Sequence, residues 1–588
     1  MTVIDWFILF LYLIFSLALG IYISLKNHNE ADYFVAGRRL NGLLAGMSMA
    51  ATTFSIDTPL YVAGIIGTRG LAGNWEWWSF GLAHVAMTVV FAPLWRRSGV
   101  LTDAAFTELR YGGKPAAYLR GIKAFLLSVP INCIGIGYAF LALRKVAESL
   151  GVVDGHIVLG PFTDTILLMV LVAMFLLVYT VLGGLWAVVV NDFVQLALAL
   201  LGAFAVCFVA LDASGGMTDL LTKLEALDRP ELLSLFPWTL NKDGFNWLDS
   251  SGISITTFFA FISLQWWSFR RSDGGGEFIQ RLLATKDEKQ ATLAGIVFLI
   301  VNYLIRSWLW ILVGLAGLVL LPQQTDWELS YPNLAVTYLP PVGLGLVVVS
   351  LVAAFMSTVS TSINWGASYL AHDLYKRFVR PSAGPREMIL IGQVASILLL
   401  LIGVVMALFS HSIGSMFRLV IAIGTGPGAV LVLRWFWWRV NALVELSAML
   451  SGFCIGLITS VSPYFTIEDF GKRLLFTTSF TAVIWLLTLF FTEPESEETL
   501  NKFVMKVKPP GPGWEKIRKS LNINSVDNFS VLGARFVLGS GILYGGLVSI
   551  GAFLLHQERS AWIALSIFVS CVFLMKKTKL ITQKVDPR

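Results

Sequence analysis

The stretch AAFMSTVSTSINWGASYLAHDLYK, residues 353–376, places a cluster of hydroxyl groups inside an apolar segment. It follows the apolar run GLGLVVVSLV, so we expect it to continue a membrane-embedded helix. Its hydroxyl side chains are Ser357, Thr358, Ser360, Thr361 and Ser362. Single hydroxyls in membrane helices bond back to carbonyls one turn earlier, but a cluster of this size exceeds what helix packing requires. The stretch therefore predicts a polar site inside a helix bundle.

The composition of the chain indicates a polytopic membrane protein. Hydrophobic residues make up 56% of the 588 residues and charged residues 14%, whereas about a quarter of a soluble globular chain is charged. The net charge of +6 does not point to nucleic acid, because basic residues of membrane proteins collect in cytoplasmic loops. We expect membrane lipid and a small-molecule solute as partners. The four cysteines show no paired or metal-ligand spacing, so free thiols are expected.

Apolar runs long enough to cross a bilayer recur along the whole chain. We count about fifteen, which predicts an all-α fold. They lie at residues 4–24, 40–67, 74–95, 121–148, 161–181, 187–210, 252–270, 291–321, 341–371, 387–409, 413–434, 440–461, 474–492, 534–555 and 560–575.

The distribution of basic residues predicts the orientation of the chain. An external N-terminus places most of the 43 lysines and arginines in cytoplasmic segments, as the positive-inside rule requires. The C-terminus is then cytoplasmic, and the expected location is the plasma membrane, or the inner membrane of a bacterium. The longest polar segments, 211–250 and 493–533, are each too short for an independent catalytic domain. Nothing in the sequence indicates the oligomeric state.

Three groups of motifs carry a resemblance to a known family. They are GGLWAVVVNDFVQ (183–195), QRLLA (280–284), and GPG (426–428) followed by FW (436–437) and RVN (439–441). In this order and on these sides of the membrane, they resemble the motifs of the sodium/solute symporter family, which includes bacterial proline and sugar symporters. The resemblance extends over most of the chain up to about residue 492.

The resemblance implies a leucine-transporter-type fold with two inverted repeats of five helices and additional flanking helices. The expected units are an N-terminal helix with the first cytoplasmic loop (1–39), the first repeat (40–210), an external loop (211–250), the second repeat (251–439), two further helices (440–492), a cytoplasmic linker (493–533), and two C-terminal helices with a basic tail (534–588).

The hydroxyl cluster then becomes a candidate sodium site. Ala354, Ser357 and Thr358 stand at i, i+3 and i+4, so one carbonyl and two hydroxyls share a helical face, and such oxygens suit a hard cation. The family pattern implies two further ligands for Na+, the carbonyls of Ala51 and Phe54 in an unwound part of the second span. The alternative is that Ser357 and Thr358 are small packing residues between helices, which is common in membranes.

An acidic residue near the cytoplasmic end of the sixth span, Asp192, is the next candidate. The resemblance implies that it lies on the route by which sodium leaves the site inward. The alternative is a carboxylate that pairs with a nearby basic residue or caps a helix. Arg306 and Arg418 are cations within spans, and we expect structural roles for both.

The segment WEWWS (75–79) is similar to a segment of bacterial sugar symporters that contacts the sugar. The similarity implies that Glu76 and Ser79 contact the solute. Other positions of that site depart from the pattern: Thr58 stands in place of an amide, Ser263 in place of an asparagine, Trp266 in place of a tyrosine and Leu419 in place of a glutamine. A sugar is therefore not assigned, although Thr58, Ser263 and Trp266 remain candidates for contact with the solute.

Asp57 is a candidate that physical reasoning supports without the family. It lies just beyond the expected unwound segment and close to Pro59, so we expect it to face a central cavity and to hydrogen-bond the solute. A structural role, accepting from amides freed by unwinding, stays open. Together with Glu76 it would favour a solute rich in donors, such as a polyol, sugar or amine, over a simple anion.

These features predict a sodium-coupled symporter that imports a small organic solute, such as a sugar or polyol, an amino acid or an amine, by alternating access, with Na+ as the coupling ion. No nucleophile with a matching base and no metal-ligand cluster stands out, so we do not expect an enzyme. The alternatives are a solute-binding membrane sensor or receptor on the same scaffold, and a passive channel. The short tail KKTKLITQKVDPR argues for a transporter.

Overall fold

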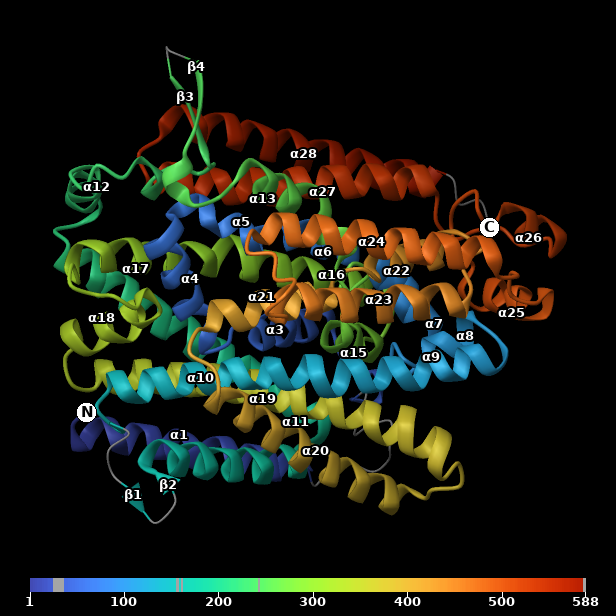
Figure 1. Cartoon of the computed structure of the whole chain (residues 1–588), viewed down its shortest axis with the longest axis horizontal. Coiled ribbons are helices and arrows are strands. Elements are labelled where there is room, and N and C mark those ends of the chain that lie inside the picture. Colours follow the sequence, from blue (N-terminus) through green and yellow to red (C-terminus); the bar gives the residue numbers. More distant parts are fainter. Residues whose placement is uncertain (25–35, 155–157, 160–161, 242–243, 585–588) are drawn as a thin grey trace.

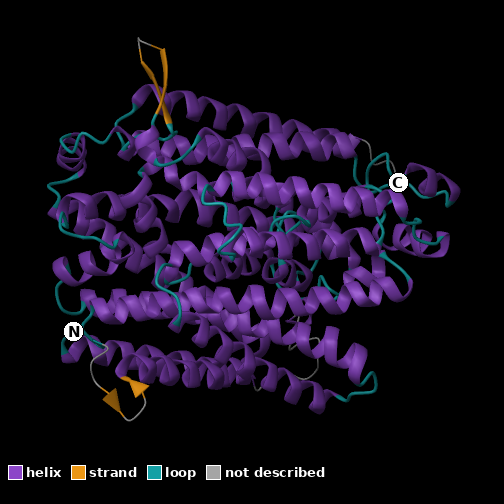
Figure 2. Ribbon diagram, viewed as in Figure 1, coloured by secondary structure: helices purple, strands orange, loops and turns teal. Residues whose placement is uncertain are grey.

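The computed structural model describes the chain except for residues 25–35, 155–157, 160–161, 242–243 and 585–588. Almost all of the described chain is helical, and the long helices run side by side along one direction (Figures 1 and 2). The uninterrupted long helices are α1 (Val3–Ser24), α11 (Asp164–Ala213), α19 (Gly343–Ser368), α20 (Pro385–Leu408), α23 (Ala442–Val461), α24 (Phe470–Phe491), α27 (Phe529–Leu554) and α28 (Glu558–Lys584).

The remaining long segments consist of several consecutive elements, which are joined by wide helical turns or divided by a break. They are α3 (Gly42–Thr53) with α4 (Asp57–Arg69); η2 (Leu71–Asn74), α5 (Trp75–Trp78), α6 (Phe80–Ala86), η3 (Met87–Phe91) and α7 (Ala92–Ser98); α9 (Gly113–Leu126), η4 (Leu127–Ile131) and α10 (Asn132–Ser149); α13 (Ile255–Ala260), η7 (Phe261–Gln265) and α14 (Trp266–Ser268); α16 (Glu288–Leu299), η8 (Ile300–Ile305) and α17 (Arg306–Leu320); η10 (Tyr369–Val379), which continues α19; and α21 (Ile413–Gly424) with α22 (Gly428–Phe436).

Short elements connect these segments. The short helices are η1 (Ala36–Arg38), α8 (Phe106–Arg110), α12 (Met217–Glu225), η5 (Pro230–Leu232), η6 (Asp249–Ser251), α15 (Gly276–Ala284), η9 (Trp327–Leu329), α18 (Ser330–Tyr338), α25 (Glu497–Val507) and α26 (Glu515–Ser520). Two antiparallel hairpins pair β1 (Val158–Leu159) with β2 (Phe162–Thr163), and β3 (Trp238–Asn241) with β4 (Gly244–Trp247).

The number of spans differs from the expected fifteen. Among the described residues, 11 helices are long and apolar enough to cross a membrane, or 12 when the bent pair α3 and α4 is counted as one span. Three expected spans do not pass the same test. The run at 252–270 contains only the short pieces from α13 to α14, the run at 413–434 is divided between α21 and α22, and the run at 161–181 belongs to α11 together with the run at 187–210.

The first span of the first expected repeat is broken. In it, α3 ends at Thr53, α4 begins at Asp57, and their axes differ by 56°. In the second expected repeat, α13, the wide turn η7 and α14 follow one another as one short helix that ends at Ser268. A broken helix is typical of transporters whose binding site lies at the centre of the membrane.

The two ends of the bundle carry different elements. The N-terminus, α12, α18 and the hairpin β3–β4 lie at one end, whereas α25, α26 and the last turn of α28 lie at the other (Figure 1). The segment expected as a linker, 493–533, packs against the bundle, because Trp514 is fully buried and its indole Nε1 donates to the carbonyl of Trp435 at 2.9 Å. The expected external loop and the expected cytoplasmic segment are therefore at opposite ends.

Candidate functional site

A central cavity of about 180 Å3 surrounds the break between α3 and α4. The helices α4, α6, α10, α15, α19 and α21 contribute to its wall. Its charged lining residues are Asp57, Arg270, Arg271, Glu277 and Arg306, and its aliphatic hydroxyl groups come from Thr52, Thr53, Ser55, Thr58, Thr358 and Ser362. Aromatic side chains, among them Tyr138 and Trp365, form much of the rest. A concave site with few convergent polar groups suits a small polar ligand.

At the end of α3, next to the break, side chains from other helices donate to the backbone and to a hydroxyl. The hydroxyl of Thr358 on α19 donates to the carbonyl of Thr52 at 2.9 Å. Arg306 on α17 donates to the carbonyl of Ala50 at 3.0 Å and to the hydroxyl of Thr53 at 2.9 Å. Since an unsatisfied backbone group in a membrane costs several kcal/mol, these contacts stabilise the interrupted helix.

Ser357 points away from Thr52 and toward the carboxylate of Asp192 on α11, to which its hydroxyl donates at 2.6 Å. The same carboxylate accepts from Ser48 at 2.5 Å and pairs with the guanidinium of Arg281 at 3.3 Å. Asp192 and Arg281 are both fully buried. Arg281 also donates to the hydroxyl of Thr361 at 2.8 Å. A buried ion pair with its own hydrogen bonds therefore lies directly beside the hydroxyl cluster.

The residues at the break suit a sodium ion in part. Thr358 contributes a hydroxyl oxygen next to the Thr52 carbonyl, and both residues line the cavity. Ala51 directly precedes Thr52, Phe54 follows it two residues later, and Ala354 lies one turn before Thr358 on α19. Carbonyl and hydroxyl oxygens are the ligands that hard cations prefer. The hydroxyl of Ser357 would have to rotate away from Asp192 to join these oxygens as an ion ligand.

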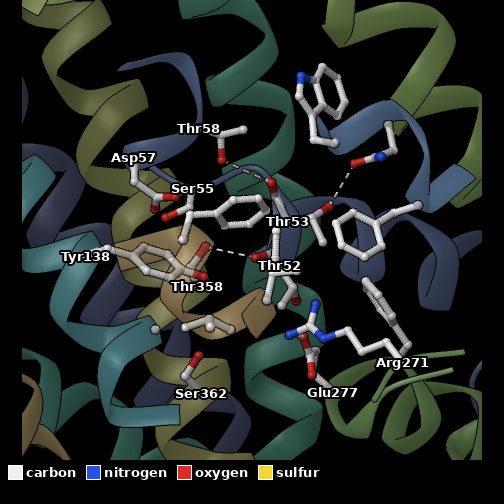
Figure 3. Close-up of a pocket in the computed structure, with 18 of the residues that line it drawn as sticks. Thr52, Thr53, Ser55, Asp57, Thr58, Tyr138, Arg271, Glu277, Thr358 and Ser362 are labelled. Atoms are coloured by element: carbon white, nitrogen blue, oxygen red, sulfur yellow. Dashed lines mark hydrogen bonds and ion pairs between the residues drawn. The ribbon is translucent and has the colours of Figure 1, made fainter. Parts of the chain in front are cut away.

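Two of the expected solute contacts, Asp57 and Thr58, line the central cavity. Figure 3 shows Asp57 and Ser55 directed into the same part of the pocket, on the side of Tyr138. The Oδ1 atom of Asp57 is buried and has no hydrogen-bond partner among the described residues. A buried carboxylate oxygen without a donor is costly, so a ligand that carries a donor would stabilise it.

The other expected solute contacts lie outside the lining of the cavity. Glu76 is fully buried, pairs with Arg69 at 2.7 Å and with Arg418 at 3.6 Å, and accepts from the hydroxyl of Tyr61 at 2.9 Å. Arg418 thereby has a partner that the sequence did not identify. Tyr61 lines the cavity, so its hydroxyl links Glu76 to the cavity wall.

Three further candidates also lie apart from the cavity. The Ser79 side chain is fully buried, and its hydroxyl has no partner among the described residues. The hydroxyl of Ser263 donates to the carbonyl of Phe259 on its own helix. Trp266 stacks on Phe536 of α27, with ring centroids 5.3 Å apart. Ser263 and Trp266, which depart from the sugar-site pattern, thus contact other protein groups and not the cavity.

A charged group of the cavity was not identified from the sequence. Arg271 forms an ion pair with Glu277, and both side chains project into the pocket (Figure 3). Arg270 lines the pocket beside them. The sequence signal for this charged group is the segment RRSDGGGEF (270–278), in which two adjacent arginines precede three glycines and an acid. These arginines follow directly on an apolar run, so they resemble the basic border of a span.

Comparison with known proteins shows what the chain resembles. The model of the sodium:solute symporter family matches residues 33–452. The sodium/glucose cotransporter of Vibrio parahaemolyticus is 25% identical over 526 residues, which cover 85% of this chain and 92% of that protein. The osmoregulated proline transporter OpuE of Bacillus subtilis (strain 168) is 26% identical over 463 residues, which cover 76% of this chain and 87% of that protein.

A solved structure supports the fold. It is described as the substrate-bound outward-open state of a Na+-coupled sialic acid symporter, and it superposes with a TM-score of 0.66 at 20% sequence identity. The superposition covers 84% of this chain and 99% of that one. At this identity the similarity establishes the architecture and not the ligand.

The buried pair of Asp192 and Arg281 generates a stability prediction. Asp192→Asn or Arg281→Gln alone leaves one buried charge without its partner, which costs about 3–5 kcal/mol. The double variant removes both charges, so we expect it to be less destabilised than the sum of the single variants. Thermal unfolding of the purified protein in detergent measures all three. Additive losses would show that the two groups do not interact.

Proposed function

Because the chain belongs to the sodium:solute symporter family, whose members couple transport to sodium, we propose that it imports a small polar solute held in the central cavity at Asp57. The chain is a multi-pass membrane protein and a sodium-coupled symporter rather than an enzyme. The proposed part is the place of each ligand: Na+ at the α3–α4 break against α19, and the solute beside it.

One observation carries the proposal. The hydroxyl of Thr358 lies 2.9 Å from the carbonyl of Thr52, and both residues face the cavity that contains Asp57. An ion bound between these oxygens would join α19 to the broken helix, and the solute would contact the first turn of α4. Since both ligands then act on the same interrupted helix, each can favour the closed state for the other.

We assign the remaining ion ligands by their position. Ala51 and Phe54 provide carbonyls at the break, and Ala354 and Ser357 provide the neighbouring oxygens on α19. Asp192 accepts the hydroxyl of Ser357 and lies behind the site, so it can receive an ion that leaves the break. The Arg281 partner of Asp192 keeps this carboxylate neutralised until the ion arrives.

We also propose that the end of the bundle that carries α25 and α26 is cytoplasmic. The excess of basic residues in the segments expected at that end supports this orientation. The N-terminus and the hairpin β3–β4 are then external, and the C-terminus is cytoplasmic, because they lie at opposite ends (Figure 1).

Removal of the Thr358 hydroxyl should weaken sodium dependence. We expect Thr358→Ala to raise the half-saturating sodium concentration of uptake about tenfold, which corresponds to about 1.4 kcal/mol, and Thr358→Ser to restore it. Ser357→Ala should act in the same direction. Ser360→Ala is the matched control, because its hydroxyl only bonds back to the carbonyl of Ser357 at 3.2 Å. Unchanged sodium dependence in Thr358→Ala would make the hydroxyl a packing group.

Asp57→Asn should affect the solute more than the ion. An amide keeps an acceptor but loses the charge, so we expect the half-saturation constant for the solute to rise about tenfold or more while that for sodium changes little. Sodium-gradient uptake into proteoliposomes measures both constants. If both rise together, Asp57 is an ion ligand. If the variant fails to fold, the carboxylate is structural.

The orientation can be measured by cysteine labelling in intact cells. In a background without native cysteines, a membrane-impermeant maleimide should label Asn246→Cys in the β3–β4 hairpin and leave Ser525→Cys unlabelled until the cells are opened. Asn246 is exposed at the end of the bundle that carries the N-terminus. Labelling of Ser525→Cys from outside would invert the proposed orientation.

A further inference from the structure

Arg270 is a cation of the central cavity that forms no direct contact with an acid among the described residues, although Glu277 lines the same cavity. Its side chain makes no hydrogen bond and no ion pair with any described residue, its Nε is buried, and its guanidinium lies 5.4 Å from the centroid of the Phe269 ring. Its backbone is fixed, because its amide donates to the carbonyl of Gly424 at 2.8 Å. The guanidinium is thus held at the wall of the cavity by its main chain and not by an acid.

The neighbouring arginines are different in this respect. Arg271 pairs with Glu277, Arg306 donates to a carbonyl and a hydroxyl, and Arg281 pairs with Asp192. Each of these guanidinium groups has a partner within the protein. Arg270 is half-buried, and only its Nε is fully enclosed. A cation at the wall of a membrane cavity that no acid of the protein contacts can bind an anion from outside the chain.

The charge balance of the cavity wall points in the same direction. Three guanidinium groups (Arg270, Arg271 and Arg306) face two carboxylates (Asp57 and Glu277), which leaves one excess positive charge. The coupling sodium ion adds another. Glu76, which would have made the region acidic, is held by Arg69 and Arg418 outside the lining. The charge balance of the wall therefore favours an anionic ligand over a further cation.

We propose that Arg270 binds an anionic group of the transported solute, and that Asp57 binds a hydroxyl or ammonium donor of the same molecule. The solute is then a small carboxylate-bearing compound with a donor group, such as an amino acid or a sugar acid, and not a neutral sugar or polyol. This inference rests on the proposed function and specifies its substrate class. A planar guanidinium can bind a carboxylate through two parallel hydrogen bonds.

A second acid near Arg270 provides the alternative. A smaller cavity of about 20 Å3 is lined by both Arg270 and Asp103, and the Oδ1 atom of Asp103 is buried without a partner among the described residues. A shift of Arg270 toward Asp103 would make the arginine a structural counter-ion. The two roles differ in what Asp103→Asn does, because only the structural role requires that carboxylate.

The test uses proteoliposomes of the full chain with an inward sodium gradient. The external medium contains yeast extract together with isotope-labelled D-gluconate, D-sorbitol, L-proline and L-prolinol, and mass spectrometry identifies what accumulates. We expect every compound that accumulates in a sodium-dependent manner to carry an anionic group. Accumulation of sorbitol or another neutral compound would overturn the inference and leave symport intact. If nothing accumulates, the proposed function itself fails.

Variants of Arg270 and Asp103 then test whether Arg270 itself binds the acidic solute. Arg270→Gln should lower uptake of the accumulated acid at least tenfold, and Arg270→Lys should recover part of it, because a charge-assisted hydrogen bond is kept. Asp103→Asn is the matched control and should leave the preference for acids unchanged. If Arg270→Gln combined with Asp103→Asn restores uptake, Arg270 is a counter-ion for Asp103 and the inference is wrong. Thermal unfolding confirms that each variant is folded.

Discussion

The hydrogen bond between the Thr358 hydroxyl and the Thr52 carbonyl joins a continuous helix to a broken one, and the site depends on it. A break in a membrane helix is tolerated only where other groups satisfy the freed backbone, and here α17 and α19 do so. The same break creates the cavity and directs Asp57 into it. One interruption thereby positions the proposed ion site and the proposed solute site against each other.

The helix α15 connects these two regions. Glu277 near its beginning pairs with Arg271 at the wall of the cavity, and Arg281, one turn later, pairs with Asp192 behind the hydroxyl cluster. Arg281 also donates to the carbonyl of Glu277 at 3.1 Å, so the two contacts share one helical turn. A displacement of α15 would change both ion pairs together, so this helix could couple the proposed solute site to the proposed ion site.

Much of this architecture could be predicted from the sequence, and the exceptions have physical causes. The motifs at 183–195, 280–284 and 426–441 identified the family, and Pro59 with the hydroxyls before it indicated the break. The shortness of the helix in span 252–270 could not be foreseen, because the helix begins at Ile255 and ends at Ser268 within a longer apolar run. The second partner of Glu76 was also hidden, since Arg418 lies on α21, far away in the sequence. Arg270 and Arg271 resembled the basic border of a span, so only the structure places them in the cavity.

Hydrogen–deuterium exchange of the purified protein, with sodium replaced by choline in the reference, tests the central claim most directly. Sodium bound at the break would order the amides around Ser55 and Ile56 and the facing turn of α19. We expect slower exchange in peptides that cover residues 50–60 and 350–360 when sodium is present, with little change in α27 and α28. Sodium-dependent protection elsewhere, with these two segments unchanged, would contradict the placement of the ion at the break.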